Sequence, residues 1–164
     1  WPVEDLRLRC AMTAEMIRVP CDGDALDLLA ARARGTPRIA NRLLRRCRDY
    51  AQVKGDGRLT TGAVTAALKL EGIDALGLDE LDRRFLRVIL DVYKGGPVGI
   101  EAVAATLGEE TDTLVDVVEP YLLQAGLLAR TRRGRLATMK AYEHLGVPYT
   151  PPPENGSLFD SESV

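Results

Sequence analysis

The chain has 164 residues, of which 46% are hydrophobic and 28% charged, and its formal net charge is −2. This composition can build one hydrophobic core or two small ones. The sequence contains no apolar run long enough to span a membrane and no recognisable signal peptide. We therefore expect a cytoplasmic protein without a membrane partner.

Cysteine and histidine are too sparse for a convincing metal site. Cys10, Cys21 and Cys47 form no C-x-x-C pair, and the single histidine, His144, is far from them in the sequence. We therefore expect no bound metal, and reduced, mostly buried thiols.

The first 74 residues are predicted to form four short helices. Apolar side chains recur at helical spacing from Val3 to Met16, from Asp24 to Arg34 and from Pro37 to about Val53. A fourth helix is expected to start at Thr60 or Thr61 and to continue through Leu70. Four helices of this length predict a small helical bundle.

Residues 75–146 are predicted to form a second unit of three helices and a hairpin. We expect Asp79 to cap the first helix and the second helix to cover Ile100 to Leu107. The third should cover about Thr111 to Gln124, with a kink near Glu119 caused by the proline that follows it. Two short apolar segments then flank the turn Arg132-Arg133-Gly134, which predicts a β-hairpin with a basic tip. This order of elements is that of a winged helix.

Residues 147–164 are predicted to be a tail without a core. Four prolines at its start are followed by glycine, serines and acids. We expect an extended segment that becomes disordered, and we assign it no functional residue.

The segment Gly35-Thr36-Pro37-Arg38 contains the residue types that a phosphate sensor at a helix N-terminus requires. Thr36 can accept a hydrogen bond from a free amide of the following helix, and Pro37 is suited to the first helical position. Arg38 adds a permanent cation with a planar set of donors beside the helix N-terminus, which itself attracts anions.

Basic residues cluster although the whole chain is slightly acidic. Seven arginines and no acid lie between Arg32 and Arg48, and five cations and no acid lie between Arg130 and Lys140. Such clusters predict local anion sites. The arginines around the hairpin turn can grip a nucleic-acid backbone without reading its sequence; they are Arg130, Arg132, Arg133 and Arg135.

The octet from Gly35 to Arg42 resembles the sensor-2 segment of the RuvB family, bacterial AAA+ ATPases that drive branch migration of Holliday junctions. The likeness continues in order to about Gly146, through Leu43-Leu44-Arg45-Arg46, Val53-Lys54-Gly55-Asp56-Gly57, Gly95-Gly96-Pro97-Val98-Gly99, Glu119-Pro120-Tyr121-Leu122 and Gly134-Arg135. The resemblance implies a mainly α fold: an AAA+ helical lid, a four-helix bundle, in residues 1–74, then a winged-helix DNA-binding domain with a β-hairpin wing in residues 75–146.

The resemblance also assigns residues to two sites. In RuvB-like proteins the arginine that matches Arg38, next to Pro37, reaches the terminal phosphates of ATP, and Trp1 stands where a tyrosine usually packs near the adenine. The arginines that match Arg130 and Arg135 contact DNA. The family usually has Arg-Thr-Pro-Arg-Gly-Arg at this wing, where this chain has Arg132 in place of the proline, followed by Arg133. The exchange replaces a stiff residue by a cation, so the wing should be more basic and less rigid.

The resemblance further implies that the catalytic part of the motor lies outside this sequence. RuvB-like proteins carry Walker A, Walker B, sensor 1 and the arginine finger in a preceding domain, and the chain contains no G-x-x-x-x-G-K-[ST]. That domain would supply the Mg²⁺ that accompanies ATP. The intact protein is expected to be an ATP-dependent DNA helicase that forms a homo-hexameric ring around DNA and binds a RuvA-like junction protein, whereas this portion alone has no catalytic residue and should be inactive.

Two alternatives come from other classes of protein. A winged-helix regulator would read a DNA sequence through its third helix, but that helix carries Asp112, Asp116 and Glu119, which phosphates would repel. A lid or collar of another AAA+ protein, such as a clamp loader, would serve subunit assembly and would have no need of a basic wing.

Overall fold

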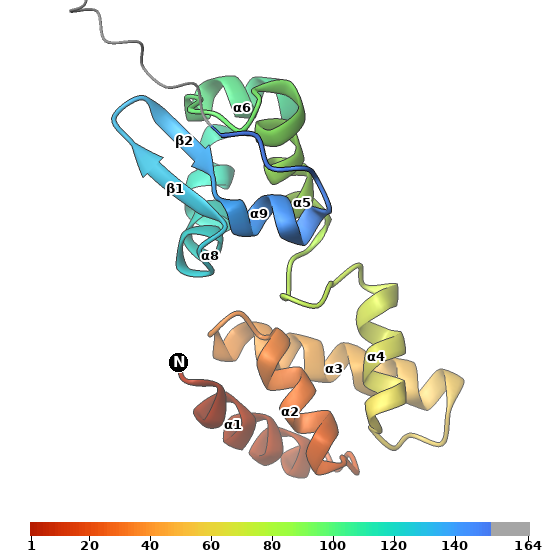
Figure 1. Cartoon of the computed structure of the whole chain (residues 1–164). Helices are drawn as coiled ribbons and strands as arrows, with labels where there is room; N and C mark the ends of the chain where they lie inside the picture. Colours follow the sequence, from red (N-terminus) through yellow and green to blue (C-terminus); the bar gives the residue numbers. More distant parts are fainter. Residues whose placement is uncertain (152–164) are drawn as a thin grey trace, which may run out of the picture. The chain divides into compact units, whose positions relative to one another are not determined.

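The computed structural model describes residues 1–151 and divides the chain into two compact units, Trp1–Glu80 and Leu81–Val164 (Figure 1). Among the described residues, no helix is both long and apolar enough to cross a membrane. The disorder expected for the end of the tail concerns residues 152–164, which lie outside the described residues.

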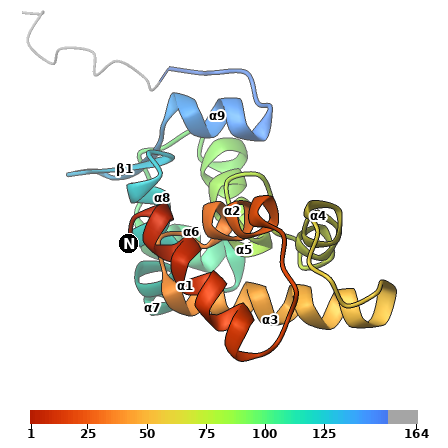
Figure 2. The ribbon, with the colours of Figure 1, turned by 90° about the horizontal axis from the view of Figure 1, so that it is seen from below.

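The first unit consists of the four predicted helices. α1 packs against α2 and α3, and α4 packs against α3 and α2, as Figures 1 and 2 show. The bounds are α1 Val3–Met16, α2 Gly23–Arg32, α3 Pro37–Lys54 and α4 Thr61–Leu70. Their apolar faces meet in one core, whose members include Leu6, Cys10, Leu29, Leu44, Cys47 and Val64. The prediction of a small helical bundle is confirmed.

Two loops of this unit are tied together beside the core. Cys21 and Leu59 form an isolated parallel bridge, in which the amide of Leu59 donates to the carbonyl of Pro20 at 2.8 Å and the amide of Asp22 donates to the carbonyl of Leu59 at 2.9 Å. Directly after this bridge, the hydroxyl of Thr60 accepts a hydrogen bond from the amide of Ala63 and caps α4. The bridge thus fixes where α2 and α4 begin.

The second unit is a helical cluster with a two-stranded hairpin. Its elements are α5 Glu80–Arg87, η1 Val88–Val92, α6 Ile100–Leu107, α7 Thr111–Thr113, η2 Leu114–Val118, α8 Glu119–Gln124, β1 Leu128–Thr131, β2 Gly134–Ala137 and α9 Met139–Leu145. Large fully buried side chains of this unit include Phe85, Leu86, Ile89, Leu114, Leu122 and Leu127. The predicted order of three helices and a hairpin is confirmed.

The predicted third helix is continuous but not uniform. It consists of α7, the π-helical turn η2 and α8, and Pro120 lies in the first turn of α8. A proline has no N–H to donate and its ring clashes with the carbonyl four residues earlier in a regular α-helix. The wider π turn η2, directly before Glu119, accommodates the proline. It lies at the place where the sequence predicts a kink.

The hairpin is fixed against the loop that precedes α6. Val98 and Arg135 exchange two main-chain hydrogen bonds of 3.0 and 2.7 Å, which add a short bridge beside β2. Gly134, at the start of β2, has a φ of +134°, and a Cβ at this position would lie 2.3 Å from the carbonyl oxygen of Val98. Glycine is therefore required for this close approach.

The helix α9 is an element of the second unit that the sequence did not predict. It buries Ala141 and Tyr142. The tyrosine also contacts the first residues of the predicted tail, because its ring packs edge-on against Tyr149 at 5.1 Å and its hydroxyl donates to the carbonyl of Thr150 at 3.2 Å. Residues 147–150 contain neither helix nor strand.

Candidate nucleotide and DNA sites

The N-terminus of α3 lacks the side-chain cap that the sequence predicts. Thr36 occupies the N-cap position with extended dihedral angles, but its hydroxyl donates to the carbonyl of Arg34 at 3.3 Å and caps no amide. The reason lies in the preceding turn, where Arg34 and Gly35 both have positive φ and Arg34 presents its carbonyl to the threonine. The prediction of a threonine cap is wrong, and the positive end of the helix stays available to an anion.

Arg38 lies in the first turn of α3 and its side chain is exposed. Pro37 precedes it at the first helical position, as predicted, and no acid lies in this turn. Arg38 makes no hydrogen bond or ion pair with any residue that the structure describes. A cation at the positive end of a helix is unfavourable. An anion bound there would satisfy both the arginine and the free amides.

Trp1 lies at the same end of the first unit. Its main-chain nitrogen donates to the carbonyl of Gly35 at 3.0 Å, which joins the start of α1 to the segment that enters α3. The indole is 58% exposed, and the guanidinium carbon of Arg9 lies 4.2 Å from the centroid of its ring. One face of the predicted aromatic plate thus carries a cation.

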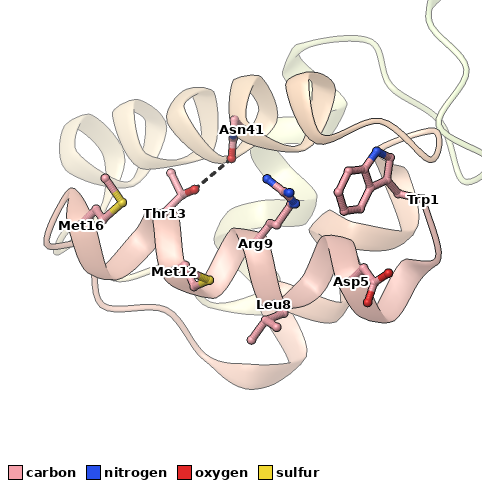
Figure 3. A pocket seen from close by; sticks show the side chains of 8 residues that line it. All are labelled: Trp1, Asp5, Leu8, Arg9, Met12, Thr13, Met16 and Asn41. Carbon is pink, nitrogen blue, oxygen red and sulfur yellow. Dashed lines mark hydrogen bonds between the residues drawn. The ribbon is translucent and has the colours of Figure 1, made fainter.

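A hollow of about 500 Å³ extends from Trp1 along α1 (Figure 3). A hydrogen bond of 3.0 Å from the hydroxyl of Thr13 to the side-chain oxygen of Asn41 joins α1 to α3 beside it. The lining residues are Trp1, Asp5, Leu8, Arg9, Met12, Thr13, Met16 and Asn41. The hollow therefore combines an exposed aromatic ring, apolar side chains and a few polar groups, a combination suited to an organic ligand.

The second candidate site is the hairpin, on which the structure brings the predicted arginines together. Arg130 on β1 lies opposite Arg135 on β2. Both side chains bind the carboxylate of Glu119, the first residue of α8: Arg130 donates to Oε2 at 2.6 Å, and Arg135 donates from Nε to Oε1 at 2.5 Å and from a terminal nitrogen to Oε2 at 3.3 Å. Glu119 is completely buried, Arg135 is 20% exposed and Arg130 is 51% exposed.

The charges of this cluster are strongly coupled. Burial by itself would raise the pKa of Glu119, but hydrogen bonds and charges from Arg135 and Arg130 outweigh it and lower the pKa below its usual range. The hydrogen bonds that Arg135 donates to Glu119 likewise raise the pKa of Arg135. The sequence did not identify Glu119 as a partner of the wing arginines; Glu119 entered the prediction as part of a family motif and as an acid that argues against sequence-specific DNA reading. The motif Glu-Pro-Tyr, collinear with the wing arginines, was the available signal.

The tip of the hairpin carries the other two predicted arginines. Arg132 and Arg133 are both exposed. Thr131 closes the turn, because its hydroxyl donates to the carbonyl of Gly134 at 2.9 Å and accepts from the amide of Arg133 at 3.3 Å. The tip therefore presents cations on a turn held by side-chain and main-chain hydrogen bonds.

The cysteines are free, as expected. Cys10 and Cys47 are buried and Cys21 is half-buried. Burial is the main cause that raises the pKa of Cys47 to about 12 and that of Cys21 to about 11. Within residues 1–151, no group of three or more histidine, cysteine or acidic side chains could hold a metal ion.

Comparison with known proteins decides the family. Residues 1–74 match the family model described as the RuvB AAA lid domain, and residues 75–146 match the RuvB C-terminal winged helix domain. The chain belongs to the RuvB family. It therefore has the mainly helical fold of a RuvB lid followed by a winged helix with a β-hairpin wing, as the resemblance implied.

Individual RuvB proteins are similar over most of this chain. The Holliday junction branch migration complex subunit RuvB of Kosmotoga olearia is 53% identical over 88% of the chain, and that of Chloroflexus aurantiacus is 54% identical over 92%. The matches cover 42% of either relative. The solved structure of the Thermotoga maritima RuvB Holliday junction branch migration motor superposes with a TM-score of 0.88 at 47% identity, over 92% of this chain and 50% of that one. The chain thus spans less than half the length of its curated RuvB relatives.

Proposed function

We propose that this chain is the lid and DNA-binding portion of an ATP-driven motor that moves Holliday junctions during DNA recombination and repair. The observation that carries the proposal is the succession of a RuvB lid and a RuvB winged helix in one chain, with relatives named as branch migration subunits. The intact protein would be a DNA helicase of the cytoplasm that works as a homo-hexamer with a RuvA-like protein. Residues 1–74 would be the lid and residues 75–146 the DNA-binding domain.

The lid would sense the nucleotide through the N-terminus of α3. Arg38 and the uncapped first turn after Pro37 supply donors and positive charge for the terminal phosphates of ATP. Trp1, joined to this end through Gly35, supplies an aromatic surface for the adenine. Mg²⁺ and the catalytic groups would come from an ATPase domain. ATP binding and hydrolysis would then move the lid and the attached winged helix.

The wing would hold the sugar-phosphate backbone of DNA. Arginine guanidinium groups match phosphate oxygens in geometry and charge, and contacts to phosphates carry no sequence information. Arg130, Arg132 and Arg133 are exposed enough for direct contact, whereas Arg135 lies deeper. Binding should therefore be sensitive to salt and weakly dependent on sequence.

The motor role is tested with the intact protein that contains this chain. Branch migration of a synthetic four-way junction is measured with ATP, for the wild type, Arg38→Ala and Arg42→Ala. Arg42→Ala is the control, because both arginines are exposed on α3, one turn apart, but only Arg38 lies in the first turn. We expect ATP-dependent migration that Arg38→Ala reduces at least about tenfold, since a phosphate-binding arginine is worth several kcal/mol in phosphoryl transfer. A wild type without migration activity would overturn the proposal.

The DNA role is tested separately by duplex binding at low salt. Arg130→Ala combined with Arg135→Ala should weaken binding, whereas Arg87→Ala, an exposed arginine of α5 in the same unit, should leave it unchanged. Equal affinity of the wild type and the double variant would remove the wing from the DNA site.

A further inference from the structure

We propose that Glu119 is a positioning residue for DNA binding: its buried carboxylate holds Arg130 and Arg135 in one orientation, in which their remaining N–H groups meet the phosphodiester backbone. The inference deepens the proposed function and rests on the wing being a DNA site. Glu119 itself would touch no DNA, because its side chain is completely buried beneath the two arginines.

The register of the hairpin creates the need for such a residue. Arg130 and Arg135 form a directly opposed pair across β1 and β2, and like charges in this position repel. Glu119 removes the repulsion, because Oε1 accepts from Arg135 and Oε2 accepts from both arginines. The two cations can then stand side by side, as two guanidinium groups that grip one stretch of backbone must.

The hydrogen bonds of the cluster leave donors free for a ligand. Arg135 binds Glu119 through Nε and one terminal nitrogen, and Arg130 binds through one terminal nitrogen. A guanidinium has further N–H groups in a rigid planar fork, so the two-point contact of Arg135 also fixes the direction of its other N–H groups, and the single bond of Arg130 anchors its guanidinium to the same carboxylate. The cluster holds two cations against one anion and keeps a net positive charge for DNA.

The local helix geometry restricts the backbone that carries the carboxylate of Glu119. Glu119 is the first residue of α8, directly after the π turn η2 and directly before Pro120. Proline restricts the backbone at this point, and single π turns are frequent at functional sites. Holding arginine rotamers before DNA arrives reduces the entropy that binding would otherwise cost.

Removal of Glu119 has two opposite consequences, and their balance makes the test decisive. A neutral side chain would make the wing more positive, which alone would tighten DNA binding and steepen its salt dependence. Loss of the orientation would weaken binding and make the salt dependence shallower, because fewer phosphates would be neutralised. A positioning residue requires that the second effect wins.

The experiment compares Glu119→Gln with Glu101→Gln in the full chain. The exposed carboxylate of Glu101 also favours the charged form of Arg135 but has no hydrogen bond to it among the described residues. Duplex DNA affinity is measured by fluorescence anisotropy over a salt series. We expect Glu119→Gln to weaken binding about tenfold, as for loss of a charged hydrogen bond, and to flatten the slope. Glu101→Gln should bind equally or more tightly. Unchanged or tighter binding by Glu119→Gln would overturn the inference.

Glu119→Asp keeps the experiment decisive if the glutamine variant does not fold. It preserves the negative charge but shortens the side chain by one methylene, so it should also weaken binding and flatten the slope. Wild-type affinity in a folded Glu119→Asp variant would contradict a positioning role.

A variant series separates this inference from the proposed function. If Arg130→Ala with Arg135→Ala does not weaken binding, the DNA role of the wing fails. If it does, adding Glu119→Gln to that variant should cause no further loss, because Glu119 acts through the two arginines. A further loss of similar size in this background would show an independent role and overturn the inference alone.

Discussion

Arg9 lies over the indole ring of Trp1, with 4.2 Å between the guanidinium carbon and the ring centroid. This cation–π contact covers one face of a ring that is otherwise mostly exposed. A nucleobase can therefore stack on the other face, or on the same face once Arg9 has moved. The ring that Arg9 covers is one of the side chains that line the hollow along α1 (Figure 3).

Trp1→Ala should weaken ATP binding by the intact protein about tenfold, because base stacking on an aromatic side chain contributes about 1–3 kcal/mol. Trp1→Tyr keeps an aromatic face and should bind within about threefold of the wild type, a difference below 1 kcal/mol. Calorimetric titration with a non-hydrolysable ATP analogue measures both. Equal affinity of the alanine variant and the wild type would place the adenine elsewhere.

Arg132 should contribute charge to DNA binding without being held in one orientation. It is exposed at the hairpin tip, next to Thr131 and Arg133, where the family usually has proline. Arg132→Ala should lower the magnitude of the slope of log affinity against log salt by about 0.9, the value for one lost phosphate contact. The measurement is duplex binding over a salt series.

Arg132→Lys provides the control for this prediction. It keeps the charge and should preserve the slope, since an exposed side chain that is not held in one orientation acts as a point charge. A slope that falls equally in the lysine variant would indicate a fixed, bidentate contact instead.

The first unit could be predicted almost completely because its signals are local. Helical spacing of apolar residues and glycine after α4 determined four helices whose observed bounds differ from the predicted ones by only a few residues. The hydrogen bond of Thr36 could not be predicted, because it depends on positive φ angles at Arg34 and Gly35, and arginine rarely adopts such a conformation.

The cluster around Glu119 depends on contacts between residues distant in the sequence. Eleven and sixteen positions separate Glu119 from Arg130 and Arg135, so no helical or strand period relates them. The helix α9 was missed for another reason: its seven residues are too few to show a clear apolar period. Resemblance to a family brought the right residues together, whereas the geometry that joins them required the structure.

Gly134→Ala should destabilise the winged-helix unit by more than about 2 kcal/mol, because backbone strain at such a φ costs about 1–3 kcal/mol and a steric clash adds to it. The added Cβ would lie 2.3 Å from the carbonyl oxygen of Val98. Urea unfolding followed by circular dichroism measures the change.

Gly108→Ala is a matched control in the same unit. Gly108 ends α6 with a φ of +72°, and a Cβ there would meet no atom within 4 Å. Only the cost of the left-handed conformation remains, about 1 kcal/mol. If both variants lose the same stability, the contact between the hairpin and Val98 does not constrain the fold.

The Glu119 cluster should make the second unit sensitive to acid. The pKa of Glu119 is lowered in the folded protein, so its ion pairs contribute their full stability above the pKa of an unfolded glutamate, about 4.3. This stability is lost as the pH falls from there through the lowered pKa. The difference in Tm between the wild type and Glu119→Gln should therefore shrink as the pH falls from neutral to about 3.

Glu101→Gln again serves as the control, because Glu101 is exposed. Its Tm should follow that of the wild type across the same pH series. A Tm difference between the wild type and Glu119→Gln that stays constant down to acid pH would mean that the carboxylate contributes through its shape and packing. In that case its charge would not be what holds the two arginines.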